Sequence, residues 1–212
     1  MLRLTITAAL CSALAAGCFG QTTPELGLFL HFDSKPSPEF VSVMQTELGS
    51  ILAPTELHLR WLIQEPAQTG PSQTWLRAVF IRFHGACSAP PGSTVEALPD
   101  TDRITLAETS VSEGTVLPYT DTDCDRLRAF LGERPEDIAG AEERLAVAMA
   151  RVIAHELYHV LLQTTEHSKG GIARAAHTPA ALLGQSLRFE SGELERIRRK
   201  YSLAQNTSFK AN

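Results

Sequence analysis

Two histidines four residues apart flank a glutamate in the segment His155-Glu156-Leu157-Tyr158-His159. On an α-helix this spacing puts both imidazoles on one face, about 6 Å apart along the axis, where they can bind one zinc ion. A carboxylate beside the first ligand can take a proton from the attacking water and pass it to a leaving group. The motif therefore predicts a zinc site with Glu156 as general base and acid.

The residues around this motif predict a long buried helix. Residues 142–162 contain neither Gly nor Pro and are rich in Ala, Leu, Val, Arg and Glu. Apolar side chains at helical spacing would seat this helix in a core: Val152, Ile153, Leu157, Val160 and Leu161. The alternative interpretation is a helix whose two histidines are merely structural.

With these residues the chain resembles the zincin metallopeptidases, in which a mixed sheet precedes a helix that carries HExxH. The resemblance is greatest to the metzincin branch, where a third histidine follows the helix. The chain is also similar to uncharacterised exported bacterial proteins with HELYHVL, a Thr-rich turn and a later His. The motif-level match covers residues 154–167. It implies that His155 and His159 bind zinc and that Glu156 is the general base.

The third histidine that the resemblance implies comes two residues later than in metzincins. Leu162 and Thr165 stand where metzincins have Gly and His, and the next histidine is His167, which gives HExxHx7H. On a continuous helix His167 would lie about 12 Å beyond His159. We therefore expect the helix to end within residues 163–165 and the chain to turn back, although no Gly is present there for a left-handed cap. No Met follows the motif, so the Met-turn of metzincins is absent.

Other residues remain open as the third ligand. Glu190 or Glu193 would make the site resemble that of the gluzincins, with a carboxylate from a later helix. His177 and Glu166 are further candidates, and His177 could instead stabilise a developing oxyanion.

The remaining pattern predicts an α+β fold: a mixed or antiparallel sheet followed by the long active-site helix and C-terminal helices. We expect strands at 28–32, 56–64, 74–83, 104–109 and 115–119, and further helices at 39–52, 123–131, from 178 and at 193–201. Alternation in the second strand points Ile63 toward the core together with Leu57, Leu59 and Trp61. By the resemblance, residues 115–119 form the edge strand that pairs with an extended peptide.

The N-terminus predicts export. Arg3 precedes an apolar run over residues 4–16, and small residues continue to Gly20, as in a secretory signal peptide of residues 1–20. Residues 21–212 then form a single zincin-like catalytic domain. A lipobox ending at Cys18 is the rival interpretation, and it would anchor the protein through lipid. The two remaining cysteines, Cys87 and Cys124, are expected to form a disulfide, because an exported domain meets an oxidising compartment. The alternative of thiolate metal ligands is disfavoured by the absence of a CxxC motif.

The net charge of the chain argues against one class of partner. The 212 residues carry a formal charge of -5, which argues against nucleic acid as a partner. We expect a secreted or periplasmic, monomeric zinc metallopeptidase with no transmembrane segment in the mature chain, acting on a peptide or protein substrate. A second enzymatic alternative is hydrolysis of another amide, such as one in cell-wall peptide, because no specificity pocket can be read from the sequence. The non-enzymatic alternative is an exported zinc-binding or interaction domain on the same scaffold.

Overall fold

The computed structural model describes residues 25–63, 77–88, 104–132 and 140–208, with the side chains of the last helix described through residue 202. The expected signal peptide of residues 1–20, with Cys18, lies outside these ranges. The elements are β1 (Glu25–Phe32), α1 (Pro38–Leu52), a 3-10 turn (Ala53–Thr55), β2 (His58–Ile63), β3 (Arg77–His84), β4 (Ala107–Ser112), β5 (Thr115–Asp123), α2 (Cys124–Leu131), α3 (Ala141–Leu162), α4 (Pro179–Leu183) and α5 (Ser191–Ser208).

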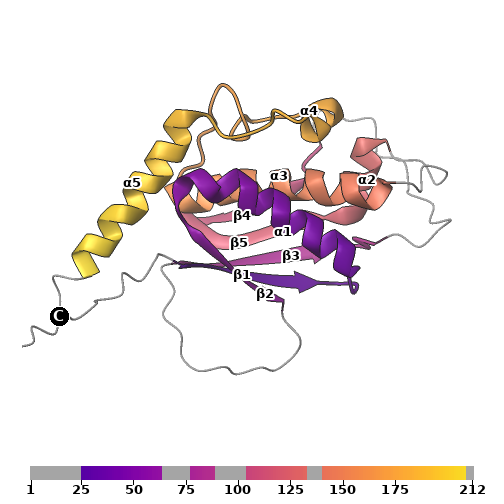
Figure 1. The fold of residues 1–212 in the computed structure, drawn as a ribbon, viewed down its shortest axis with the longest axis horizontal. Coiled ribbons are helices and arrows are strands. Elements are labelled where there is room, and N and C mark those ends of the chain that lie inside the picture. The colour runs from indigo at the N-terminus through magenta and orange to yellow at the C-terminus, as the bar shows by residue number, and fades with distance from the viewer. Residues whose placement is uncertain (1–24, 64–76, 89–103, 133–139, 209–212) are drawn as a thin grey trace, which may run out of the picture.

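The strands form one mixed sheet in the order β2-β1-β3-β5-β4 (Figure 1). β1 is parallel to both β2 and β3, and β3 is parallel to β5. Only the pairing of β4 with β5 is antiparallel within the described sheet. The expected α+β class, with a mixed sheet before the long helix and C-terminal helices after it, is confirmed.

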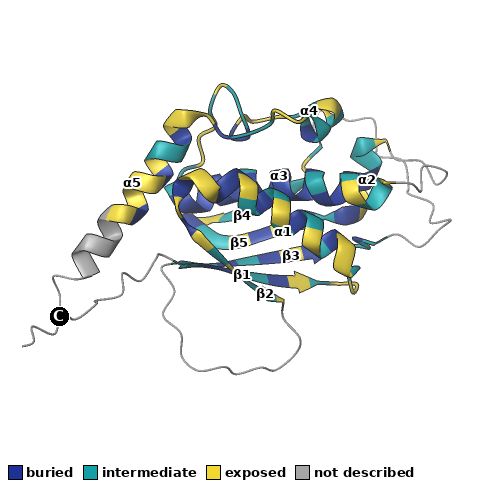
Figure 2. Cartoon of the chain, in the orientation of Figure 1, coloured by how far each residue is buried: buried dark blue, intermediate teal, exposed yellow. Residues whose placement is uncertain are grey.

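Helices α1 and α3 lie side by side over the same face of the sheet (Figure 1). Helix α1 begins after Ser37, whose Oγ accepts a hydrogen bond of 3.0 Å from the Phe40 N–H, with Pro38 as its first residue. Helix α3 is long and apolar enough to cross a membrane by composition alone, but 83% of that stretch is buried inside the protein. Figure 2 shows α3 as a largely buried helix between the sheet and the segment that contains α4. It is the core helix that the motif required.

Two expectations about the strands are wrong. Strand β5, which includes residues 115–119, is not an edge, because it lies between β3 and β4, and the edge beside α3 is β4. Ile63, which was expected to point into the core, is instead 49% exposed. It is the last residue of the edge strand β2.

The expected disulfide joins Cys87 to Cys124 across 37 residues. Both cysteines are buried, and the bond ties the chain just after β3 to the first residue of α2. Asp123 caps α2 by accepting a hydrogen bond of 2.9 Å from the Arg126 N–H. Strands β4 and β5 therefore lie inside a covalently closed loop.

Candidate metal centre

Helix α3 presents His155 and His159 on one face, as the four-residue spacing requires. Their Nε2 atoms lie 3.2 Å apart, and the two ring planes meet at 73°. His159 is only 8% exposed, while His155 is half-buried. The two rings therefore converge with their outer nitrogens toward a common point.

The helix ends at Leu162, and its C-cap residue Gln163 takes the left-handed conformation (φ 55°, ψ 51°) that Gly usually supplies. The Gln163 side-chain amide donates hydrogen bonds to the carbonyls of Val116 (3.1 Å) and Val160 (2.9 Å). The next N–H, that of Thr164, donates to the His159 carbonyl over 3.2 Å. These bonds offset the cost of left-handed backbone at a residue with a side chain, so the chain turns back without Gly.

The turn brings His167 to the pair on α3. Its ring centroid lies 5.1 Å from that of His155 and 4.8 Å from that of His159. One nitrogen from each of the three rings falls within 4.8 Å of the others, which makes a group that could hold a metal ion. The extended HExxHx7H spacing thus delivers three imidazoles to one point.

The other candidates for the third ligand lie outside this group. The Glu193 carboxylate accepts a hydrogen bond of 2.7 Å from the Glu190 N–H and so caps the start of α5. Within the described residues, the only cluster of ligand-type side chains that could hold a metal is the one of three histidines, without Glu166, Glu190 or His177.

Hydrogen bonds on the far side of two rings show that the group fits a metal ion. The Nδ1 of His155 lies 2.8 Å from the Ile172 carbonyl oxygen, and the Nδ1 of His159 lies 2.7 Å from the Thr164 carbonyl oxygen. A carbonyl oxygen only accepts, so each Nδ1 carries the hydrogen and each neutral ring keeps its lone pair on Nε2. Two such lone pairs facing each other over 3.2 Å repel unless a cation lies between them.

Burial keeps the rings of His155 and His167 in the neutral form that binds metals. It lowers the pKa of His155 to about 4, and it also lowers the pKa of His167. At neutral pH both rings therefore offer lone pairs instead of positive charge.

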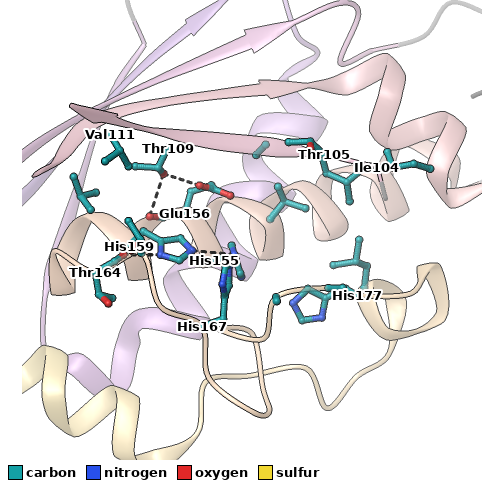
Figure 3. A pocket seen from close by; sticks show the side chains of 18 of the residues that line it. Ile104, Thr105, Thr109, Val111, His155, Glu156, His159, Thr164, His167 and His177 are labelled. Carbon is teal, nitrogen blue, oxygen red and sulfur yellow. Dashed lines mark hydrogen bonds between the residues drawn. The ribbon is translucent and has the colours of Figure 1, made fainter. Parts of the chain in front are cut away.

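Glu156 is only 7% exposed and is held from the edge strand (Figure 3). The Thr109 hydroxyl, on β4, donates a hydrogen bond of 2.6 Å to Glu156 Oε2, and it lies 3.2 Å from the Thr120 hydroxyl on β5. Burial raises the pKa of Glu156, while the hydrogen bond from Thr109 acts against that rise. The result is an oriented, partly desolvated carboxyl group next to the first histidine.

These groups open into a cleft of about 880 Å³. Its histidine end carries His155, His159 and His167 together with Glu156, and residues of β4 form one wall. The lining also includes large apolar side chains: Ile104, Leu106, Phe130, Val152 and Leu182. The arrangement therefore combines a metal-ligand set and a buried carboxyl with a partly apolar cavity.

A buried ion-pair network fixes the segment that supplies the Ile172 carbonyl. Arg151, 4% exposed and one turn before His155, donates from Nε to Glu47 Oε1 (2.8 Å) and from Nη1 to the Gly184 carbonyl (2.7 Å). Arg188 also donates to Glu47 Oε1, over 2.9 Å. The Arg188 carbonyl in turn accepts the Ile172 N–H, over 2.9 Å. Helix α1 is thus linked to the loop beside the histidines.

Sequence reasoning missed Thr109 and Ile172. The motif contains neither residue, and a backbone carbonyl leaves no mark on residue type. The sequence did offer one signal for Thr109, the strand expected over residues 104–109, but it does not say that this strand lies beside α3.

No family model matches the chain, and no curated protein matches it. Among solved structures, it is similar to archaemetzincin from Methanopyrus kandleri, with 12% sequence identity and a TM-score of 0.48. That likeness covers 87% of this chain and 99% of the archaemetzincin chain. The described residues themselves bear out the zincin-like pattern suggested by the motif, with a mixed sheet, a long helix carrying HExxH and a third histidine folded back onto it.

Proposed function

We propose that this chain is a zinc metallopeptidase. The observation that carries the proposal is the convergence of His155, His159 and His167 in a cleft that also holds the buried carboxyl of Glu156. These three histidines would hold the ion. When bound there, zinc supplies a Lewis acid that polarises a peptide carbonyl and lowers the pKa of water.

Glu156 is the residue of this chain that moves the proton. The Thr109 hydroxyl holds its carboxyl group, and burial raises its pKa, so it is a stronger base than an exposed glutamate. It takes a proton from the attacking water and returns that proton to the amine that leaves. Metal holding alone requires no such carboxyl, which favours an enzyme over a binding module.

The edge strand supports an extended peptide as substrate. β4 ends the described sheet, so its outer N–H and C=O groups have no neighbouring strand there. Thr105, Ala107, Thr109 and Val111 all line the cleft. A peptide added along this edge would lie beside the three histidines and would contact the apolar wall with alternate side chains.

Export is part of the proposal. A disulfide such as Cys87–Cys124 persists in an oxidising compartment, which supports secretion or a periplasmic location for residues 21–212 as one monomeric domain. The mass of the N-terminal peptide of the exported protein tests this. A start at Gln21 is expected, whereas a lipid-modified Cys18 would replace a soluble product with an anchored one.

The experiment on function uses the chain without residues 1–20, purified with zinc. We expect about one zinc per chain, marked loss of zinc in His167→Ala, and cleavage of a broad peptide library. Glu156→Gln should keep its zinc and lose turnover by roughly 10²- to 10⁴-fold, the usual contribution of a general base.

Two outcomes contradict the proposal at different levels. If the wild-type protein binds no zinc even after reconstitution, the metal site is refuted. If it binds zinc but cleaves nothing in the library, or Glu156→Gln cleaves as well as wild type, the peptidase mechanism is refuted. Zinc binding without any cleavage would instead support the alternative, a non-catalytic zinc-binding domain.

A further inference from the structure

The carbonyl oxygen of Ile172 lies within hydrogen-bond distance of two imidazoles. The His155 Nδ1 lies 2.8 Å from this oxygen and the His177 Nε2 lies 3.0 Å from it. Since a carbonyl oxygen has two lone pairs and only accepts, both nitrogens carry their hydrogens. One backbone atom thus joins His155, a proposed metal ligand, to a histidine outside the cluster.

His177 is not placed to bind the metal itself. Its Nε2 is taken by the Ile172 carbonyl, and its Nδ1 is buried without a hydrogen-bond partner in the described structure. The ring centroids of His155 and His177 lie 6.1 Å apart, and the two ring planes are almost perpendicular. Both rings line the cleft (Figure 3). Burying the unpaired Nδ1 acceptor of His177 costs free energy. We therefore look for the role of His177 in the hydrogen bond that its Nε2–H donates to the Ile172 carbonyl.

The Ile172 carbonyl is held from both directions. Its own residue is fully buried, and the Ile172 N–H donates to the Arg188 carbonyl over 2.9 Å. On the other side, His177 closes a loop back onto Ile172, five residues earlier in the chain. The backbone fixes the peptide that carries the oxygen, and the His177 N–H fixes where that oxygen points.

We propose that His177 is a positioning residue for the metal centre. By holding the Ile172 carbonyl it keeps the His155 Nδ1–H engaged, which sets the tautomer and orientation of the His155 ring and aims Nε2 at the metal. Partners of this kind typically change metal affinity when they are removed. The inference rests on the metal-binding part of the proposed function and is independent of the substrate.

The test compares three variants with wild type. His177→Phe keeps a ring but loses the N–H. His177→Gln restores an amide N–H at about the reach of Nε2. His58→Phe makes the same chemical change at an exposed position on β2. Zinc affinity is measured by competition with a chromophoric chelator, and the geometry at the metal by the visible absorption of the Co²⁺-loaded protein.

We expect His177→Phe to bind zinc more weakly than wild type, by less than the roughly 10- to 100-fold that loss of a direct partner of a ligand costs, because His177 acts through the Ile172 carbonyl. We expect His177→Gln to recover most of that loss and His58→Phe to match wild type. The Co²⁺ spectrum should change in His177→Phe and return toward that of wild type in His177→Gln. Restoration by an amide separates the N–H from a role of the ring in packing.

The outcomes distinguish this inference from the proposed function. Absence of zinc and Co²⁺ binding in wild type would refute the metal site, and with it this inference. Equal affinity and equal spectra in wild type and His177→Phe would refute His177 alone. Equal weakening in His177→Phe and His177→Gln would also refute it, because the N–H would then be irrelevant. If the apo form of His177→Phe does not fold, His177→Asn takes its place, since its amide is one methylene too short to reach.

Discussion

The Thr109 hydroxyl lies 2.6 Å from Glu156 Oε2, although the two residues are 47 positions apart in the chain. This hydrogen bond joins the edge strand to the carboxyl group of Glu156 on the core helix. The strand pairing shifts between Thr109 and Val111, the kind of irregularity that re-aims side chains beside active sites. The carboxyl group proposed as the general base is thus oriented from outside its own helix.

We expect Thr109→Val to lower turnover by about 10- to 100-fold, because a hydrogen bond to a carboxylate contributes roughly 1.5–3 kcal/mol. Zinc content should stay at the wild-type level, since Thr109 contacts no histidine of the cluster in the described hydrogen bonds. Thr109→Ser retains the hydroxyl and is the matched control. Peptide cleavage under saturating substrate measures the effect, and a valine variant as fast as wild type would contradict it.

Gly171→Ala should destabilise the loop that carries the Ile172 carbonyl. Gly171 has a φ of +60°, and a Cβ there would lie 2.6 Å from the Arg188 carbonyl oxygen. The backbone conformation alone costs a residue with a side chain about 1–2 kcal/mol, and the clash adds to this. Gly114→Ala is the control, because Gly114 has a φ of +77° and nothing within 4 Å of its Cβ position.

Urea unfolding measures both glycine variants. Gly171→Ala is expected to lose more free energy of unfolding than Gly114→Ala and to bind zinc more weakly, since its loop carries the His155 partner. Equal losses in the two variants would mean that the Arg188 contact adjusts without cost.

His84 should stabilise the protein more at acidic than at alkaline pH. Its ring lies between Asp121 (2.8 Å) and Asp33 (3.1 Å). The hydrogen bond to Asp121, and then the one to Asp33, raise the pKa of His84 above its ordinary value of 6.5. A raised folded-state pKa gives stability that is fully present below about 6.5 and is lost as pH rises through the folded-state pKa.

The measurement for His84 is the difference in Tm between wild type and His84→Asn from pH 5.5 to pH 9. The advantage of wild type should be largest at the acidic end and should shrink as pH rises. A difference that is constant across this range would show that the charge on the ring contributes nothing.

Removal of the disulfide should cost about 4 kcal/mol in the chain-entropy account, because it opens a long closed loop. The bond spans 37 residues and encloses both β4 and β5. Urea unfolding of the Cys87→Ala/Cys124→Ala variant, beside wild type with and without reductant, measures this. Reduced wild type and the double variant should agree. A variant as stable as the oxidised protein would contradict the entropic role.

Much of the site could be predicted because its residues are close in the chain. His155, Glu156 and His159 follow from helical spacing, and α3 was identified from a stretch without Gly or Pro. The helix was expected to end around residues 163–165, and it ends at Leu162 with Gln163 as its C-cap. What the sequence could not show is that a glutamine takes the left-handed position, since that depends on the Val116 carbonyl from a distant strand.

Strand order was beyond the sequence for a related reason. Residues 115–119 look like a complete strand, and the polar residues after them suggest its end. In the structure β5 continues to Asp123, and its Thr120 and Thr122 are buried, with the Thr122 hydroxyl against Met149 of α3. Pairing partners decide whether such a strand is central or at an edge, and residue types along one strand do not encode its partners.

The three histidines of the cluster, the Ile172 carbonyl and His177 all come from residues 155–177. The entropy cost of closing so short a segment is small and grows only slowly with length. Metal uptake would nevertheless report tertiary order, because the turn that brings His167 back is held by the Val116 carbonyl of β5. Turnover would also require β4, because Thr109 on that strand holds the Glu156 carboxyl group. The ligand set and the proposed general base thus depend on two different neighbouring strands.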